Sequence, residues 1–506
     1  MLRSILWNAA RACRVAVTVA ACVSIATLVV ITLMRLVYPY ELEWIEGGVV
    51  DHIDRIREGQ PYYGPPSIHG TAFIYPPLYF YTAAAVSFLT GPGFVPLRLV
   101  SWTSCMLGIA LIFRIVSRES GGRAGGVVAA GTYAACFEFC GSWCDIGRVD
   151  SLLLLLLLTS VYILRFRTSV AGAVACGTVL TLAFFTKQTA IGLLVPCLVV
   201  ALFRGWRHLA ALASVAAVGM GGGLLLLNWL FDGWFWWYAF HLVYHHRRMR
   251  HLLHQFWTEA VLPVMGIAIL LAAIYVIGRA LSRDLSGASF WALTGGGLVV
   301  LAWISTAKVG GFSNLGMPAA ASLAIFVGLA FEQAFQLARD RSTAPAALVA
   351  LLVAAGSGVQ LCLLAYDPRA QVPTAADRAA GDRVVAKIRS LPGDVFTPFH
   401  GHLTTAAGKK RWVHVMAVDD CIRGDRGEAT QRLQAELHEA LSGKKFGAVV
   451  LGGPMRDVEQ WLARDLLPSY GPTDRFFEDD ASFWPRTGRH IRPEAIWQPK
   501  ARAAAP

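Results

Sequence analysis

Three glutamates follow the first long apolar run of the chain at short intervals. They are Glu41, Glu43 and Glu46, in the stretch Y-E-L-E-W-I-E-G-G at residues 40–48. A carboxylate that is partly desolvated beside a bilayer has a raised pKa, and it can then act as a general base near neutral pH. The alternative interpretation is that these glutamates only begin a solvated loop. The residues around the glutamates must show whether they act as a base or only begin a solvated loop.

Cationic side chains recur in other short polar stretches. Arg148 lies in D-I-G-R-V-D, Lys187 in T-K-Q, Lys308 in K-V-G-G-F-S-N, and Arg247 and Arg248 in H-H-R-R-M-R. Arginine and lysine bind phosphate oxygens, so a base that faces such cations at a membrane surface suits transfer chemistry on a lipid-linked phosphate. The two lysines could instead be anchors whose ammonium groups reach lipid headgroups.

The composition shows which kind of scaffold must hold these side chains. Hydrophobic residues make up 55% of the chain and charged residues only 15%, with a mean hydropathy of +0.50. No single soluble core could cover so much apolar surface, so we expect a polytopic membrane protein. The net charge of +12 does not indicate nucleic acid, because the arginines cluster between apolar runs, as they do in cytoplasmic loops. The ten cysteines are scattered and predict no disulfide framework.

The apolar runs predict about eleven membrane-spanning helices. They lie near residues 15–34, 95–116, 126–141, 150–164, 170–185, 189–203, 209–231, 260–278, 288–305, 317–335 and 346–366. If the further stretch 72–90 also crossed, the later arginine clusters would lie opposite Arg3, Arg11 and Arg14, against the positive-inside tendency. We therefore expect 72–90 to lie in the membrane interface.

This topology predicts a fold class and a domain organisation. We expect a polytopic α-helical membrane protein of the inner or plasma membrane, with a small α/β domain on the extracytoplasmic side. Residues 1–366 would form the membrane domain, residues 37–94 its first external loop with interfacial helices, and residues 367–506 the soluble domain. In that domain the segments 394–399, 412–416 and 446–453 are expected to be extended.

The same topology brings the polar stretches to one face of the membrane. Arg247 and Arg248 would lie where positive charge is scarce, so we expect an anion to meet them, either a prenyl phosphate or an anionic lipid. Tyr63 could stack on a sugar ring, or it could belong to an aromatic belt. His241 and His245 share a helical face, which permits a divalent cation, although contact with phosphates or headgroups is the favoured interpretation.

Five sequence landmarks occur in an order that resembles the GT-C superfamily of membrane glycosyltransferases, which includes protein O-mannosyltransferases and aminoarabinose transferases. They are I-E-G at 45–47 followed by a helix, G-Q-P-Y at 59–62, Y-P-P-L-Y-F at 75–80, and Asp150 opening a leucine-rich run before T-K-Q at 186–188. Where the superfamily usually has Asp directly before the Glu, this chain has Ile45.

The resemblance implies roles for individual residues. Glu46 becomes the leading candidate for the base, with Glu43 as the alternative because it could supply the missing carboxylate. Lys187 would contact the donor phosphate, and Asp150 would lie nearby in the site. The pattern of polar stretches, rather than the resemblance, adds Arg148, Arg247, Arg248 and Lys308 as further cations for the phosphate. The residues expected to contact the rest of the substrate are Asp150, Tyr63, Tyr75, His245 and Asn314.

The activity implied is transfer of a sugar from a polyprenyl-phosphate-linked donor to an acceptor at the outer face of the membrane. A transporter or flippase for lipid-linked saccharides is one alternative, but it usually needs ionisable groups near the bilayer midplane, whereas the charges here collect at the ends of the apolar runs. A membrane-anchored envelope scaffold is the other. The sugar and the acceptor are not determined by the sequence.

Overall fold

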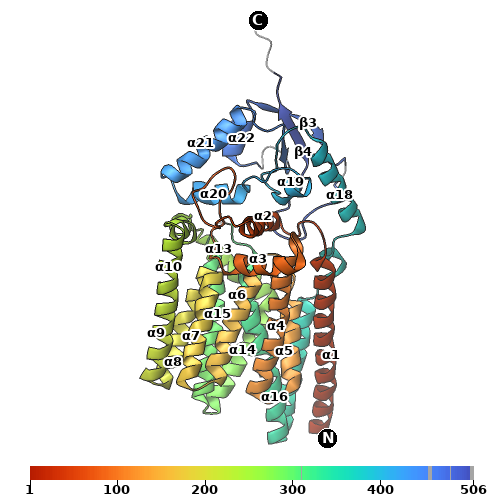
Figure 1. Ribbon diagram of the computed structural model, residues 1–506. Helices are drawn as coiled ribbons and strands as arrows, with labels where there is room; N and C mark the ends of the chain where they lie inside the picture. The colour runs from red at the N-terminus through yellow and green to blue at the C-terminus, as the bar shows by residue number, and fades with distance from the viewer. Residues whose placement is uncertain (309, 454–457, 479, 502–506) are drawn as a thin grey trace.

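The computed structural model describes residues 1–308, 310–453, 458–478 and 480–501. A bundle of long helices forms one part of the molecule, and a smaller domain of helices and strands covers one end of it (Figure 1). The N-terminus lies at the opposite end of the bundle from this domain, which contains the C-terminal part of the chain. All the loops discussed below as a candidate site lie between the two parts.

The helices of the bundle follow the predicted apolar runs. They are α1 (Leu2–Leu36), α4 (Phe94–Ser120), α5 (Arg123–Ala135), α6 (Asp150–Phe166), α7 (Val170–Thr186), α8 (Ile191–Arg204), α9 (Trp206–Ala216), α10 (Gly222–Leu230), α14 (Leu262–Leu281), α15 (Leu285–Ser305), α16 (Met317–Arg341) and α17 (Ala344–Leu363). Among the described residues, seven helical stretches are long and apolar enough to cross a membrane. The protein is therefore an integral membrane protein, and the count of eleven spans stays a prediction.

Two helices lie at the covered end of the bundle. α2 (Glu46–Arg57) and α3 (Leu78–Thr90) pack against each other there, beneath the C-terminal domain (Figure 1). α3 has 13 residues, and at 1.5 Å per residue it is about 20 Å long, shorter than a hydrocarbon layer of about 30 Å. This length agrees with the expected helix in the interface, and the place of 72–90 in the interface stays a prediction.

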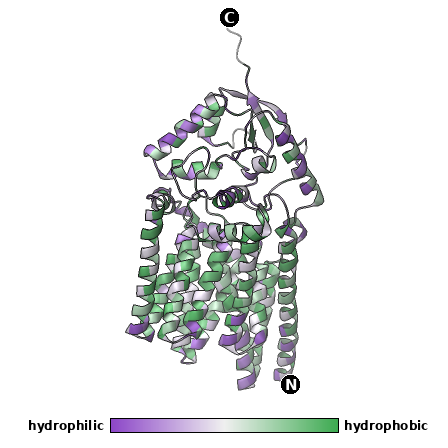
Figure 2. Cartoon of the chain, in the orientation of Figure 1, coloured by the Kyte–Doolittle hydropathy of each residue, from purple (hydrophilic) through white to green (hydrophobic). Residues whose placement is uncertain are grey.

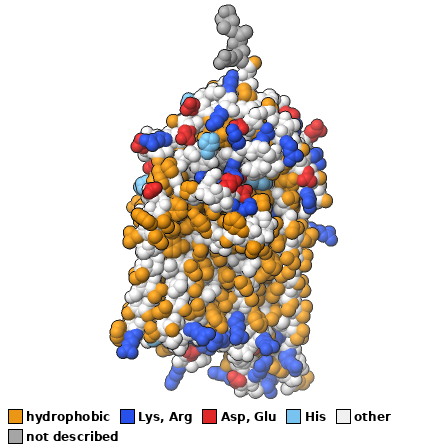
Figure 3. All heavy atoms as spheres, in the orientation of Figure 1, with side chains coloured by type: hydrophobic (Ala, Val, Ile, Leu, Met, Phe, Trp, Pro, Cys, Tyr) orange, Lys and Arg blue, Asp and Glu red, His pale blue; other side chains and the backbone are white. Residues whose placement is uncertain are grey.

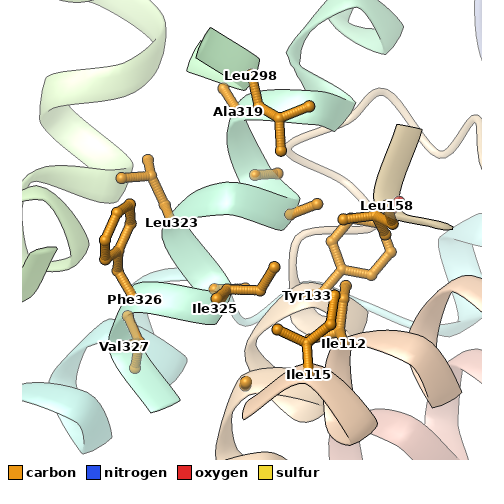
Figure 4. Packing of buried hydrophobic residues seen from close by; sticks show 14 of the residues in the cluster. Ile112, Ile115, Tyr133, Leu158, Leu298, Ala319, Leu323, Ile325, Phe326 and Val327 are labelled. Carbon is orange, nitrogen blue, oxygen red and sulfur yellow. The ribbon is translucent and has the colours of Figure 1, made fainter. Parts of the chain in front are cut away.

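The core of the bundle is built around α16. In its most apolar stretch 94% of the residues are buried, and it packs against α4, α5, α14, α15 and α17. Phe326 and Val327 project from α16 toward surrounding helices (Figure 4). Gly125 of α5 and Gly328 of α16 let the two backbones approach closely, because a Cβ on Gly328 would lie 2.3 Å from the Gly125 carbonyl oxygen.

Charge and hydropathy divide the surface of the molecule. The bundle is predominantly hydrophobic and the covering domain is mixed (Figure 2). Lysine and arginine side chains gather at the end of the bundle that lies away from the C-terminal domain (Figure 3). Several of these arginines lie in the last turn of a helix, where cations interact favourably with the helix dipole: Arg118 of α4, Arg165 of α6, Arg279 of α14, and Arg339 and Arg341 of α16.

The C-terminal domain is a small α/β unit. Its helices are α18 (Ala375–Ser390), α19 (His402–Ala406), α20 (Val415–Gly424), α21 (Glu428–Ser442) and α22 (Gln460–Leu466), and its strands are β1 (Val395–Phe396), β2 (Ala448–Leu451), β3 (Tyr470–Arg475) and β4 (Ala495–Pro499). The strands form one sheet in the order β1-β2-β4-β3, with β1 parallel to β2 and the other pairs antiparallel.

The prediction that residues 412–416 are extended is wrong for Val415 and Met416, which are helical. α20 begins at Val415, because the His414 side chain accepts a hydrogen bond from the Met416 N–H and caps the helix. Tertiary contacts also fix the segment just before it, since the Val413 N–H donates to the Ile68 carbonyl oxygen at 2.9 Å. Three short helices, α11 (Trp234–Trp236), α12 (Val243–His245) and α13 (His251–Gln255), complete the covered end.

Candidate active site

A cavity lies where the loops at the covered end of the bundle meet α20 of the C-terminal domain. It has two adjoining chambers that share Tyr75, Arg148 and Lys187. The larger one, of about 290 Å³, is also lined by Glu43 and is called the Glu43 chamber. The smaller one, of about 100 Å³, is also lined by Lys308 and is called the Lys308 chamber. At the covered end of the bundle the walls therefore combine the carboxylate of Glu43 with the cations Arg148, Lys187 and Lys308, each from a separate loop.

Glu43 is the carboxylate of the larger chamber. It is fully buried, and its Oε2 accepts a hydrogen bond of 2.9 Å from Nη1 of Arg148. Its Oε1 is buried without a hydrogen-bond partner among the described residues. Burial raises the pKa of Glu43 to about 7, although the Arg148 guanidinium opposes this shift. A buried carboxylate with one oxygen held by an arginine and the other unpaired is suited to accept a proton near neutral pH.

Glu46 has a different environment, three residues further along the chain. Its two oxygens accept bonds from the Arg98 guanidinium, at 3.1 and 2.7 Å. The backbone N–H groups of Gly147 and Leu42 also donate to it, at 2.6 and 2.8 Å. Burial alone would raise the pKa of Glu46, but Arg98 and these N–H groups hold it below its ordinary value. Glu46 does not line either chamber; it ties α2 to α4 and to the loop before α6.

Two tyrosines hold Arg148 in place. Nη2 of Arg148 donates to the Tyr75 hydroxyl at 3.1 Å, while Nη1 is engaged with Glu43. The Tyr63 hydroxyl donates to the Tyr75 carbonyl oxygen at 2.6 Å. Tyr63 lies outside the chamber walls, so it supports the segment that carries Tyr75. The bonds to Glu43 and Tyr75 therefore fix the orientation of the Arg148 guanidinium in the wall of the Glu43 chamber.

Lys187 lies at the end of α7 and forms a buried ion pair with Asp150 at the start of α6, with Nζ and Oδ1 2.7 Å apart. The second oxygen of Asp150 accepts a bond of 3.0 Å from the Trp143 indole. Asp150 itself does not line the chambers, but it holds the lysine whose ammonium does. Asn314 lines the Glu43 chamber as well. An ammonium group has three donors, so Lys187 can engage an anion while it keeps Asp150.

The smaller chamber adds a second lysine and groups from the C-terminal domain. Burial and the nearby Lys187 lower the pKa of Lys308 to about 8. Asp420 of α20 lines the same chamber, and burial raises its pKa to about 7. Its carbonyl oxygen lies 3.1 Å from Nε2 of His246. Two lysines that oppose each other's charge in one enclosure favour the entry of an anion.

Three residues predicted to contact substrate lie elsewhere. Arg247, Arg248 and His245 are exposed and line neither chamber. Arg248 instead pairs through its backbone with Lys308, in an isolated antiparallel bridge. The Nδ1 atom of His245 lies 2.9 Å from the carbonyl oxygen of His241, one helical turn away. The neighbouring His246, not His245, faces the chambers.

The C-terminal domain contributes residues that the sequence analysis did not single out. Asp419 and Arg423 of α20 line the Glu43 chamber as an ion pair of 2.8 Å. Glu459 and Arg489 line it as a second pair, 2.7 Å apart. No motif marked them, because their place in the wall depends on how the two domains dock. The only signal was the adjacent acidic pair D-D at 419–420.

Across the described ranges, no three His, Cys, Asp or Glu side chains are grouped so that they could hold a metal ion. His241 lies instead 3.4 Å from a carboxylate oxygen of Asp425. The charges that line the two chambers are those of the protein's own side chains.

Comparisons with known proteins bear on this geometry. The family model described as dolichyl-phosphate-mannose-protein mannosyltransferase matches residues 75–231. ArnT from Cupriavidus metallidurans, solved with undecaprenyl phosphate, is similar in structure, with a TM-score of 0.57 and 14% identity over 94% of this chain and 97% of that chain. The apo form gives a TM-score of 0.59 over the same shares, also at 14% identity. The chain has the fold of the GT-C membrane glycosyltransferases.

A more distant likeness supports the same fold. The archaeal oligosaccharyltransferase AglB from Archaeoglobus fulgidus, in complex with an inhibitory peptide and a dolichol-phosphate, gives a TM-score of 0.50 at 11% identity. The match covers 84% of this chain and 69% of that chain. A comparison with curated proteins finds no match. The fold class expected from the order of the motifs is confirmed by these comparisons.

Proposed function

We propose that the protein is a glycosyltransferase that uses a polyprenyl-phosphate-linked sugar as donor and transfers the sugar to an acceptor hydroxyl. The observation that carries the proposal is the arrangement in the Glu43 chamber. A carboxylate with one open oxygen and a pKa near 7 lies in the same walls as Arg148 and Lys187. Structural relatives with this fold were solved with undecaprenyl phosphate and with a dolichol-phosphate, which supports a donor of this class.

In the proposed reaction the acceptor hydroxyl attacks the anomeric carbon of the donor sugar. Glu43 takes the proton of that hydroxyl through its open Oε1. The bond between the anomeric carbon and the phosphate oxygen breaks, and the leaving prenyl phosphate gains negative charge next to Arg148, Lys187 and Lys308. Preorganised cations of this kind stabilise the transition state because they do not need to reorient as charge develops. A single displacement of this type inverts the anomeric configuration.

A mostly apolar groove of about 380 Å³ adjoins the Glu43 chamber and supports a lipid-linked donor. The two share Gly311 and Phe312 in their walls. Beyond these residues the groove is lined mainly by apolar side chains such as Phe139, Phe256 and Val264, together with the polar residues Gln255, Glu259, Thr306 and Ser313. A prenyl chain has the apolar surface that such a groove would bury. The phosphate of a lipid in this groove would be close to the cations of the chambers.

We further propose that the chambers and the C-terminal domain lie on the extracytoplasmic side. The lysine and arginine side chains at the other end of the bundle support this orientation (Figure 3), because cytoplasmic loops carry an excess of these residues. A cysteine introduced at exposed Arg247 should react with an impermeant thiol reagent in intact cells, whereas one at exposed Arg339 should not. Labelling of the second position alone would reverse the proposed orientation.

The activity is tested with purified protein in lipid vesicles that contain a polyprenyl-phosphate sugar. Release of polyprenyl phosphate together with appearance of the sugar on an acceptor is the expected result. Replacement of the ion pair by Lys187→Met with Asp150→Asn should lower the rate by about 10²–10³, and it leaves no unpaired buried carboxylate. Arg247→Ala is the control, because this arginine is exposed and outside the walls. Folded wild-type protein that moves the intact donor across the membrane without cleaving it would instead indicate a flippase.

A further inference from the structure

One segment of the C-terminal domain reaches the loop that carries Glu43. The backbone N–H groups of Arg486 and Thr487 donate to the Leu42 carbonyl oxygen, at 2.8 and 3.1 Å. Thr487 also pairs with Glu43 in an isolated parallel bridge. The Thr487 hydroxyl donates to the carbonyl oxygen of Gly141, in the loop between α5 and α6. The segment therefore joins the backbone next to Glu43 to the rest of the bundle.

The next residue, Gly488, lies against the Glu43 side chain itself. A Cβ at position 488 would be 2.9 Å from both Cγ and Oε1 of Glu43, and 3.1 Å from Cδ1 of Trp44. Real Cβ atoms essentially never come closer than about 3.0 Å to another heavy atom, and Glu43 has no simple way to retreat, because Arg148 holds its Oε2 at 2.9 Å. Gly488 also has a φ of +80°, a conformation that glycine adopts without strain.

We propose that Gly488 of the C-terminal domain is a positioning residue for the carboxylate of Glu43. The absence of a side chain at this position leaves room for the unpaired Oε1 of Glu43, and the pairing of Thr487 with Glu43 fixes the backbone from which the carboxylate extends. The C-terminal domain thus completes the reactive site rather than only covering it. The inference rests on the proposed function, since it assumes that Glu43 acts as the base.

Gly488→Ala and Gly408→Ala form a matched pair for the test. Gly408 belongs to the same domain and has a φ of +75°, but a Cβ there would meet nothing within 4 Å. Both substitutions impose the same type of backbone strain, whereas only the first pushes on Glu43. We expect Gly488→Ala to lower kcat by about 10²-fold, the loss expected when a reacting group is misplaced by about 1 Å. The KM for the prenyl-linked donor should change little, and Gly408→Ala should behave like wild type.

The pH dependence of kcat distinguishes positioning from general damage. In the wild type the rate should fall below the Glu43 pKa of about 7; in Gly488→Ala the midpoint of this fall should move, because Oε1 meets a new neighbour. In a Glu43→Gln background, Gly488→Ala should cause no further loss of kcat. Wild-type kcat and an unchanged pH profile in Gly488→Ala, or an equal loss in Gly408→Ala, would overturn the inference.

If the Gly488→Ala variant does not fold, a second variant still tests the inference. If Gly488→Ala is not folded, Thr487→Val carries the test, because it removes the hydroxyl bond to Gly141 and keeps the side-chain shape. A lower kcat with an unchanged donor KM supports positioning, and an unchanged kcat overturns it. If the wild type transfers no sugar, the proposed function is contradicted. If the wild type is active and Gly488→Ala has the same kcat and pH profile, only this inference is contradicted.

Discussion

Glu43 and Glu46 are the same residue type, three positions apart, and each is buried beside an arginine. Glu46 receives bonds from Arg98 and from two backbone N–H groups, so both of its oxygens are used and its pKa is lowered. Glu43 receives a bond from Arg148 on one oxygen only, and burial raises its pKa to about 7. The two glutamates share burial and a neighbouring arginine, and they differ in the number of hydrogen-bond donors around the carboxylate. The Arg98 charge and three donor groups hold Glu46 in place and ionised, whereas Glu43 keeps an unpaired oxygen that can accept a proton.

The largest expected effect comes from removing the open carboxylate. Glu43→Gln should lower kcat by about 10²–10⁴, the usual contribution of a general base. The melting temperature in detergent should fall less than in Glu46→Gln, because the raised pKa of Glu43, about 7, means that this carboxylate is only partly ionised near neutral pH. Glutamine can also still accept a bond from Arg148. The measurement is the rate of sugar transfer at saturating donor. Full activity in a folded Glu43→Gln protein would show that Glu43 is not the base.

The next effect concerns the other carboxylate. Glu46→Gln should destabilise the protein by about 3–5 kcal/mol, because it leaves the buried Arg98 guanidinium without its counter-ion. Thermal unfolding followed by the fluorescence of the tryptophans measures this loss. If Glu46→Gln instead kept its melting temperature and lost transfer activity, the base would have to be reassigned to Glu46.

A smaller effect is the pH dependence of the wild type. Since the ionised form of Glu43 accepts the proton and its pKa is about 7, kcat should be constant above this pH and fall by about tenfold per pH unit below it. Rates from pH 5 to 9 measure the profile. This fall of kcat at low pH should be absent from the residual activity of Glu43→Gln. A fall with its midpoint near pH 4.5 in the wild type would mean that burial does not raise the pKa of Glu43.

The smallest effect tests the support of Arg148. The Ser101 hydroxyl donates to the Arg148 carbonyl oxygen at 3.2 Å, so Ser101→Ala should weaken the placement of this arginine by about 1 kcal/mol, which is about fivefold in kcat. Ser104→Ala on the same helix is the control, because its hydroxyl bonds only to the Val100 carbonyl within α4. Equal changes in the two variants would show that Arg148 needs no help from α4.

The fold followed from the sequence to a large extent, and the candidate site to a smaller one. The apolar runs predicted the long helices because the hydrocarbon layer sets their length and composition. Arg148, Lys187 and Tyr75, which were marked by motifs, lie together in the chambers. Arg247 and His245 belong to a basic stretch whose side chains point elsewhere, and no local pattern tells which face of a short helix will meet a cavity.

The sequence by itself determined that this is a membrane protein with its polar loops at one end and a small α/β domain after the last apolar run. These properties depend on composition and on the order of segments, which the chain carries locally. Only the tertiary structure decided which glutamate has both oxygens bonded and which keeps one unpaired. It also decided that Asp420 lines the Lys308 chamber and that Gly488 lies against Glu43. Hydrogen bonds and close contacts between residues hundreds of positions apart are set by the docking of domains, and no single stretch of sequence encodes them.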